Sequence, residues 1–183
     1  MKSRTSVHLL LLAVLAASVL TATAQPAVSL ATMQAALKFR ADLATAVGSQ
    51  AETPASALQR LRASGAASGF TAEPDVDLAY AALDVGHRLL ALHRPDAAEE
   101  FFRAAETAFE QASNRTPRAQ AREKAQYLQK LALVRGNYLN KVAQAKADID
   151  EAIQLQPNDK SLDESRRVLA RGRGEQFKEP GKN

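Results

Sequence analysis

The sequence predicts an all-α protein of about seven helices, stacked as antiparallel hairpins in a short solenoid. Alanine is abundant and aromatic residues make up only 5% of the chain, a composition that favours helices packed closely through small side chains. Apolar residues recur at steps of three and four, which indicates amphipathic helices, and period-two alternation is scarce. Pairs of such helices recur along the chain, as is typical of helical repeat proteins.

The first 24 residues have the features of an export signal. Lys2 and Arg4 give a positive start, an apolar run follows from Leu9 to Leu20, and Ala22-Thr23-Ala24 supplies the small residues that signal peptidase accepts. We therefore expect a Sec-type signal peptide cleaved after Ala24, and a periplasmic or secreted bacterial protein. The alternative is an uncleaved membrane anchor, but the run is short for a span that needs about 20 residues.

Charge and cysteine content narrow the classes of function. The signal segment holds two of the 24 Lys and Arg residues and none of the 20 Asp and Glu residues, so the mature chain has a net charge near +2. Such a balance predicts no nucleic-acid partner. The chain contains no cysteine, which excludes disulfides, thiolate metal sites and a lipid-modified cysteine. No stretch after the signal is apolar enough to predict a transmembrane span in the mature chain.

Residues 25–171 are expected to form a single helical domain. Its first helix is predicted over residues 27–47 with Gly48 as its stop, and Thr53 is the expected N-cap of a second helix that begins at Pro54. Residues 65–73 contain two glycines and are expected to form a flexible surface loop. A linker between an N-terminal hairpin and the rest of the chain is the alternative for this segment.

The clearest helices follow this loop. The third is predicted from Pro74 to His93 and the fourth from Pro95 to Ser113, both with acidic residues in their first turn. Thr116-Pro117 is expected to start the fifth helix, which Gly136 ends at residue 135. A sixth helix is predicted over residues 137–156 with Asn137 as its cap, then a shorter helix over 161–171. Residues 172–183 are expected to be a disordered tail.

One helix pair carries a family resemblance. Its first helix has an apolar-glycine pair followed by a large residue, and its second has a small, an aromatic and a small residue. The residues that carry this pattern are Val85, Gly86, Leu89, Ala98, Phe102 and Ala105. In the next pair, the second-helix half is matched by Ala145, Ile149, Ala152 and the terminal Pro157. In order and spacing these residues resemble the tetratricopeptide repeat (TPR), over roughly residues 78–169.

The resemblance implies a divergent TPR-like solenoid, in which Gly86 allows a close approach of the second helix through Ala98. The period differs, because Pro74 and Pro117 start equivalent helices 43 residues apart and the family repeat has about 34 residues. The first helix of the later pair also lacks the apolar-glycine match. A plain helical bundle is the alternative fold, and residues 27–64 form either a first repeat or a separate arm.

The resemblance also implies a concave groove, lined by the first helix of each pair, that binds a peptide or protein segment. On the third helix the expected groove residues are Tyr80, Leu83, His87 and Leu90, and on the fifth they are Glu123, Gln126 and Lys130. Each of these residues also fits an ordinary exposed or half-buried helix position.

Reactive residues form no recognisable constellation. His87 and His93 are six positions apart, whereas a pair of metal ligands on a helix is spaced by three or four. The carboxylates at Glu99-Glu100 and at Asp148, Asp150 and Glu151 fit helix termini and solvated helix faces better than an acid–base pair. The sequence therefore predicts no catalytic residue, cofactor or metal.

We expect a non-enzymatic interaction scaffold whose partner is another protein or a second copy of itself. A self-associating structural bundle of the cell envelope is the alternative. The C-terminal end is basic through Arg166, Arg167, Arg171, Arg173 and Lys178. We expect a solvated tail there, or a weak contact with the anionic envelope surface, in preference to RNA binding.

Overall fold

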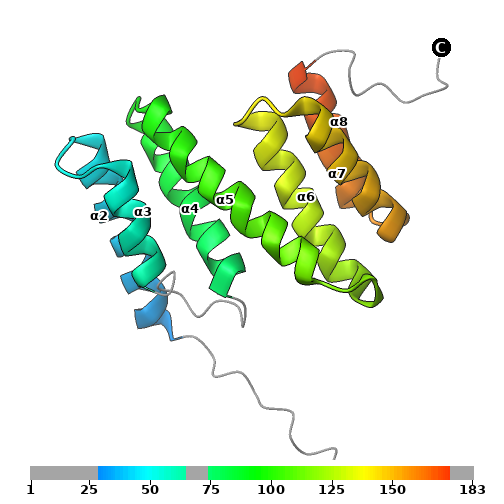
Figure 1. The fold of residues 1–183 in the computed structure, drawn as a ribbon, viewed down its shortest axis with the longest axis horizontal. Coiled ribbons are helices and arrows are strands. Elements are labelled where there is room, and N and C mark those ends of the chain that lie inside the picture. The colour runs from blue at the N-terminus through cyan, green and yellow to red at the C-terminus, as the bar shows by residue number, and fades with distance from the viewer. Residues whose placement is uncertain (1–28, 65–73, 174–183) are drawn as a thin grey trace, which may run out of the picture.

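The computed structural model describes residues 29–64 and 74–173, and these residues are all-α (Figure 1). They form seven α-helices and one 3₁₀ turn, with no strand among the described residues. The elements are α2 (Leu30–Gly48), α3 (Pro54–Ala63), α4 (Pro74–Ala91), α5 (Pro95–Arg115), η2 (Arg118–Gln120), α6 (Ala121–Asn137), α7 (Val142–Leu155) and α8 (Lys160–Arg173). None of these helices has both the length and the apolar character that a membrane crossing requires.

Local chemistry explains where several helices begin. The Ser29 side chain accepts a hydrogen bond of 3.1 Å from the Thr32 backbone N–H, and Thr53 accepts one of 3.2 Å from Ser56. Both therefore satisfy a helix-terminal donor that would otherwise lack a partner. Pro54 and Pro95 occupy the first helical position, where a missing N–H costs nothing.

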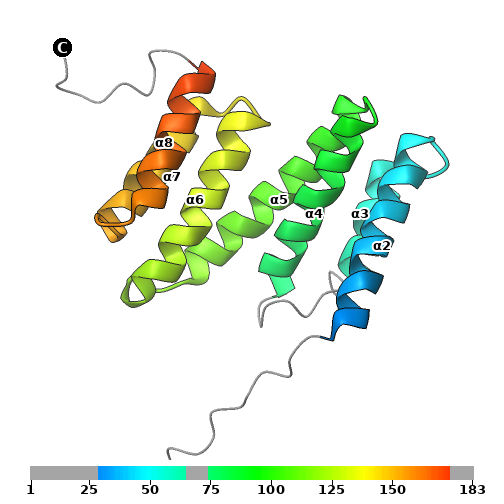
Figure 2. The same cartoon turned by 180° about the vertical axis from the view of Figure 1, so that it is seen from behind.

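The helices pack in an ordered row. The tightest contacts join α4 with α5 and α6 with α7, while α5 packs against α6. α2 contacts α4, and α3 contacts α5 and α4, more than α2 and α3 contact each other. Seen from behind, α2, α4 and α6 follow one another across the molecule (Figure 2). The first pair is therefore held mainly by the second pair.

Two hydrophobic cores share α6. The N-terminal core is built from α2 to α5 and takes Tyr127, Leu131 and Val134 from α6. The C-terminal core takes Ala125, Leu128 and Ala132 from the same helix and is completed by α7 and α8. Because α6 buries two faces, it joins the two halves of the protein.

Two glycines permit close packing. A β-carbon added at Gly86 would lie 2.6 Å from Cε1 of Phe102 on α5. One added at Gly136 would lie 2.3 Å from Cδ2 of Leu169 on α8 and 3.4 Å from Cβ of Ala145 on α7. No larger residue fits either position without a shift of its neighbours.

The boundary between the fifth and sixth helices differs from the prediction. Thr116 does not start the fifth helix: its hydroxyl donates to the Ala112 carbonyl oxygen at 2.8 Å and so ends α5. α6 begins later, at Ala121, and continues through Gly136 to Asn137. Asn137 is therefore the last residue of α6 and not the cap of α7. Glycine usually ends helices, but Gly136 lies inside α6, where close packing against Leu169 and Ala145 requires it.

The remaining differences lie at the ends of helices. Nine of the ten predicted packing residues are buried, whereas Pro157 is exposed in the turn between α7 and α8. α8 reaches Arg173, two residues into the predicted tail. The predicted signal peptide (residues 1–24), the loop at 65–73 and the rest of the tail (174–183) lie outside the described residues.

Candidate functional site

The predicted groove residues of α4 share one side of the helix, which is open from Tyr80 to Leu90 and buried one turn earlier, at Val76. Tyr80 and Leu90 are exposed by 40% and 39%, and Leu83 is a partly buried residue that packs on the N-terminal core. The Tyr80 ring rests edge-on against Phe109 of α5, with centroids 5.3 Å apart. The aromatic side chain is thus exposed yet supported by the core.

His87 belongs to an aromatic group that joins α4 to the end of α6. Its Nε2 shares a hydrogen bond of 2.8 Å with the Tyr138 hydroxyl. The Tyr138 ring stacks on Phe102, with centroids 4.1 Å apart and planes 16° from parallel. Burial raises the pKa of Tyr138, so its phenol stays protonated at neutral pH. His87 is therefore held in a fixed position at the surface, which the sequence did not indicate.

α6 has one side that neither hydrophobic core covers. One side faces the N-terminal core and another faces the C-terminal core, which leaves Gln126, Lys130 and Asn137 on the third. Lys130 is half-buried and makes no ion pair with any described residue. Sequence reasoning missed Asn137 because it placed that residue at the start of the next helix.

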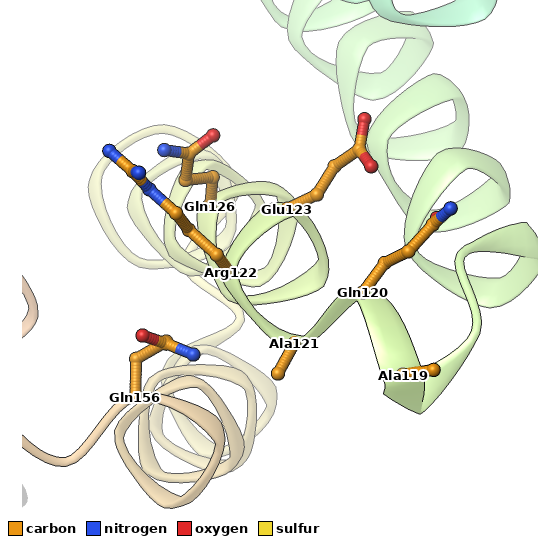
Figure 3. A pocket seen from close by; sticks show the side chains of 7 residues that line it. All are labelled: Ala119, Gln120, Ala121, Arg122, Glu123, Gln126 and Gln156. Atoms are coloured by element: carbon orange, nitrogen blue, oxygen red, sulfur yellow. The ribbon is translucent and has the colours of Figure 1, made fainter. Parts of the chain in front are cut away.

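Glu123 and Gln126 lie together at a hollow near the start of α6 (Figure 3). The hollow has a volume of about 480 Å³ and is lined by Ala119, Gln120, Ala121, Arg122, Glu123, Gln126 and Gln156. Arg122 and Gln126 extend to one side, and Glu123 points to the other. The Tyr127 hydroxyl donates to Glu123 at 3.0 Å. Glu123 thus stabilises the helix locally, and it lies two turns before Lys130 on nearly the same side of α6.

α2 extends the uncovered surface with residues that the groove prediction did not include. Arg40 is buried and faces Asp84 and Asp77 of α4; burial lowers its pKa and these carboxylates oppose that effect. Phe39 lies under Arg60 of α3, 5.7 Å from its guanidinium carbon.

With those two sides of α2 occupied, Leu30 and Leu37 are left exposed by 70% and 45%. We call the uncovered sides of α2, α4 and α6 the open face. Its residues are Leu30, Leu37, Tyr80, Leu83, His87, Leu90, Gln126, Lys130 and Asn137.

Opposite the open face, a buried ion group joins three helices. Arg135 of α6 donates to Glu106 (2.8 Å) and Glu110 (2.6 Å) of α5 and to both carboxylate oxygens of Asp148 on α7 (3.0 Å each). Lys141 also reaches Glu106, at 2.7 and 2.8 Å. The side chains of Arg135 and Glu106 are each only 9% exposed. Charges buried to this extent must be paired, and these are.

The pKa values within this group show which charges are well compensated. Burial pushes the pKa of Glu106 upward, but hydrogen bonds and charge from Lys141 and Arg135 outweigh it and hold the pKa below its ordinary value. Burial raises the pKa of Asp148, and Glu110 and Glu151 add to that effect against the attraction of Arg135. Every member has a partner within the group, and these pairs join α5, α6 and the start of α7.

Other chemistry-bearing residues do not converge. His93 lies in the turn after α4, and no group of three or more His, Asp and Glu residues suited to a metal ion occurs within residues 29–64 and 74–173. Arg166 and Arg167, which belong to the basic C-terminal end, lie on α8 beside Asp163 and Glu164. Comparison with protein-family models, curated proteins and solved structures finds no match to this chain.

Proposed function

We propose that this chain is an exported, non-enzymatic scaffold that binds a peptide or protein segment through the open face. In this proposal residues 1–24 direct export and are removed after Ala24, and the mature protein works in the periplasm or outside the cell. Its chemistry is recognition: apolar side chains supported by a rigid core give affinity, and the polar residues of α6 give orientation.

One observation carries the proposal. Four of the six large hydrophobic side chains that are exposed among the described residues, Leu30, Leu37, Tyr80 and Leu90, lie on the open face. Exposed apolar residues scattered singly need no explanation, whereas a cluster on one face is typical of an interaction site.

A TPR-like arrangement is part of the proposal. Its support is the row of helix pairs, the close packing at Gly86, and the equivalent burial of Ala98, Phe102 and Ala105 with Ala145, Ile149 and Ala152. α5 and α7 begin 47 residues apart, at Pro95 and Val142, so these three positions correspond one to one. This spacing is longer than the family period, as in the sequence.

Site-specific photo-crosslinking in the native envelope tests the proposal. A photoreactive amino acid at Leu90 is expected to crosslink a protein partner, whereas the same residue at Val168 is not. Val168 on α8 is a matched control because it is exposed by 41%, close to the 39% of Leu90. Tyr80→Ala and His87→Ala should reduce the Leu90 crosslink without a large change in melting temperature. Equal crosslinking at both positions, or none at Leu90, argues against the open face as the site.

The second candidate is a self-associating structural bundle, since the same apolar cluster could bury itself against a second copy. Sedimentation of the purified mature protein separates the two functions. A concentration-dependent dimer that Leu37→Ala abolishes favours self-association, and a monomer at all concentrations excludes it.

A further inference from the structure

We propose that the partner segment is an amphipathic α-helix that lies over α4, with its apolar stripe against α2 and α4 and an acidic flank toward Lys130 of α6. This inference rests on the proposed function and specifies the chemistry of the partner. It follows from the length of the apolar part of the open face and from the charge on one side of it.

Contacts at the end of α2 fix its register against α4. The Arg94 guanidinium donates to the backbone carbonyl oxygens of Val47 (3.2 Å) and Gly48 (2.5 Å), at the end of α2. A β-carbon at Gly48 would touch Leu92, so these two residues lie at one level. Arg40 then lies at the level of Asp84, which agrees with the charge interaction between them.

This register gives the apolar surface a length. Leu30 of α2 lies at the level of residue 74, and Leu90 of α4 marks the other end, 16 residues along. α2 alone provides the first part of this length, because α4 is buried at Val76 and becomes exposed at Tyr80. At 1.5 Å per residue this distance is roughly 24 Å, the length of a helix of about four turns. Leu37 and Tyr80 fall between these ends on neighbouring helices. Residues on two helices about 9 Å apart make a surface as wide as the stripe of an amphipathic helix, which is wider than one extended strand.

The charged groups beside this surface differ between its α2 side and its α6 side. On the α2 side, the charged groups near Leu37 are already neutralised, because Lys38 pairs with Asp42 at 2.6 Å and Arg40 faces two carboxylates. Arg88 pairs with Asp84 at 3.2 Å on α4. On the α6 side Lys130 has no ion partner among the described residues, and Gln126 and Asn137 on the same side are neutral. Glu123, two turns before Lys130, accepts a hydrogen bond from the Tyr127 hydroxyl. A carboxylate on the partner's α6-facing side therefore meets a free cation, whereas a basic residue there is repelled.

Synthetic peptides of about 16 residues test this chemistry directly. One peptide carries leucines at i, i+3, i+4 and i+7 with glutamates along one flank; a second has lysines in place of these glutamates; a third has the composition of the first but a scrambled order. Binding to the full mature protein is measured by fluorescence anisotropy at low and at high salt. We expect the glutamate peptide to bind at least about fivefold more tightly than the lysine peptide at low salt, and the difference to shrink at high salt.

Two pairs of variants separate the contributions. Lys130→Glu should weaken binding of the glutamate peptide about fivefold or more and strengthen binding of the lysine peptide. Lys160→Glu makes the same charge change at an exposed position on α8 and should have no effect. Leu37→Ala should weaken both peptides, whereas Val168→Ala, which truncates a side chain of similar exposure, should weaken neither. Circular dichroism verifies that all four variants keep their helix content.

The possible results are distinct. Equal affinity for the glutamate and lysine peptides, or an unchanged affinity in Lys130→Glu, overturns the acidic flank. Equal binding of the scrambled peptide overturns the amphipathic helix. If no peptide binds but a partner crosslinks at Leu90, the proposed chemistry is wrong and the proposed function stands. If no peptide binds and no partner crosslinks at Leu90, the proposed chemistry and the proposed function are both wrong. A dimer that buries Leu37 then identifies a second copy as the occupant.

Discussion

The α4–α5 pair and the α6–α7 pair solve the same packing problem with different chemistry. In both, a buried glycine on the first helix lets another element approach closely. The residue before that glycine is Val85 in the first pair and Arg135 in the second, and both are buried. Val85 only needs apolar neighbours, whereas Arg135 requires three carboxylates from two other helices.

This difference determines how each pair depends on its surroundings. Apolar burial has no preferred direction, so many arrangements of neighbours satisfy Val85. A buried guanidinium is stable only where its hydrogen-bond partners stand in the right places. The α5–α6–α7 junction is therefore the more specific part of the fold and the more easily broken one.

Replacing Arg135 tests this conclusion with the largest expected effect. Arg135→Met leaves the half-buried Asp148 without its partner and Glu106 with Lys141 alone, so it should reduce the free energy of unfolding by about 3–5 kcal/mol. Urea denaturation of the mature protein measures the change. A double variant with Asp148→Asn should recover part of the loss, since it removes the carboxylate charge that Arg135→Met leaves without a partner.

Arg103→Met is the matched control for this experiment. Arg103 pairs with Glu99 on the surface of α5, with side chains 62% and 48% exposed. Breaking an exposed pair of this kind should cost less than about 0.5 kcal/mol. A similar cost for the two arginine variants would mean that the buried ion group contributes no more than a surface pair.

The two glycines differ in how their neighbours can yield. At Gly86 an added methyl group meets the Phe102 ring, which Tyr138 holds by stacking, so Gly86→Ala should cost about 1–3 kcal/mol. At Gly136 it meets mainly the Cδ2 methyl of Leu169, the far end of a flexible side chain that no stacked ring holds. At both positions alanine also favours the helix by about 1 kcal/mol, so the neighbours decide the difference. Gly136→Ala should therefore cost about 1 kcal/mol or less in the same assay, and the reverse order would contradict this account.

Acidification should weaken the ion group through Glu106. The pKa of Glu106 is lower in the folded protein than in the unfolded chain, so its contribution to stability is present above about pH 4.3 and is lost as the pH falls through the lowered folded value. Asp148 acts in the opposite direction, because its pKa is raised on folding and stability returns as the pH falls through that raised value.

Urea denaturation between pH 7 and pH 3 measures both contributions. Glu106→Gln should make the loss of stability on acidification smaller than in the unmodified protein. Asp148→Asn should make that loss larger, because it removes the opposing contribution. Parallel pH profiles for the three proteins would mean that neither carboxyl group controls acid stability.

The same contrast explains how much of the fold could be predicted. The spacing of Val85, Leu89, Phe102 and the alanines around them depends on helical periodicity alone, so the all-α class and the α4–α5 pair followed from the sequence. Arg135 looked like an ordinary charged residue near a helix end, because its partners are 13 to 29 positions away. No local pattern connects them.

The open face was suggested in part by the resemblance to the TPR, which gave Tyr80, Leu83, His87 and Leu90 as groove residues of α4. Their binding of a partner stays a prediction. The contribution of α2 depends on its register against α4, which Arg94 and Gly48 fix through contacts between distant residues. The hydrogen bond between His87 and Tyr138 joins positions 51 apart. Such features require the tertiary structure.

The smallest expected difference in stability between the two helix pairs lies in their turns. Each contains a non-glycine residue in the left-handed region, His93 with φ of 58° and Asn140 with φ of 55°. That conformation costs most residues about 1 kcal/mol, but asparagine adopts it more readily than histidine. Both side chains are exposed, so a change to glycine removes little packing. His93→Gly should therefore raise the free energy of unfolding by about 0.5 kcal/mol, and Asn140→Gly should change it less. Thermal denaturation of both variants measures the difference, and a larger gain at Asn140 would mean that histidine is not strained in the α4–α5 turn.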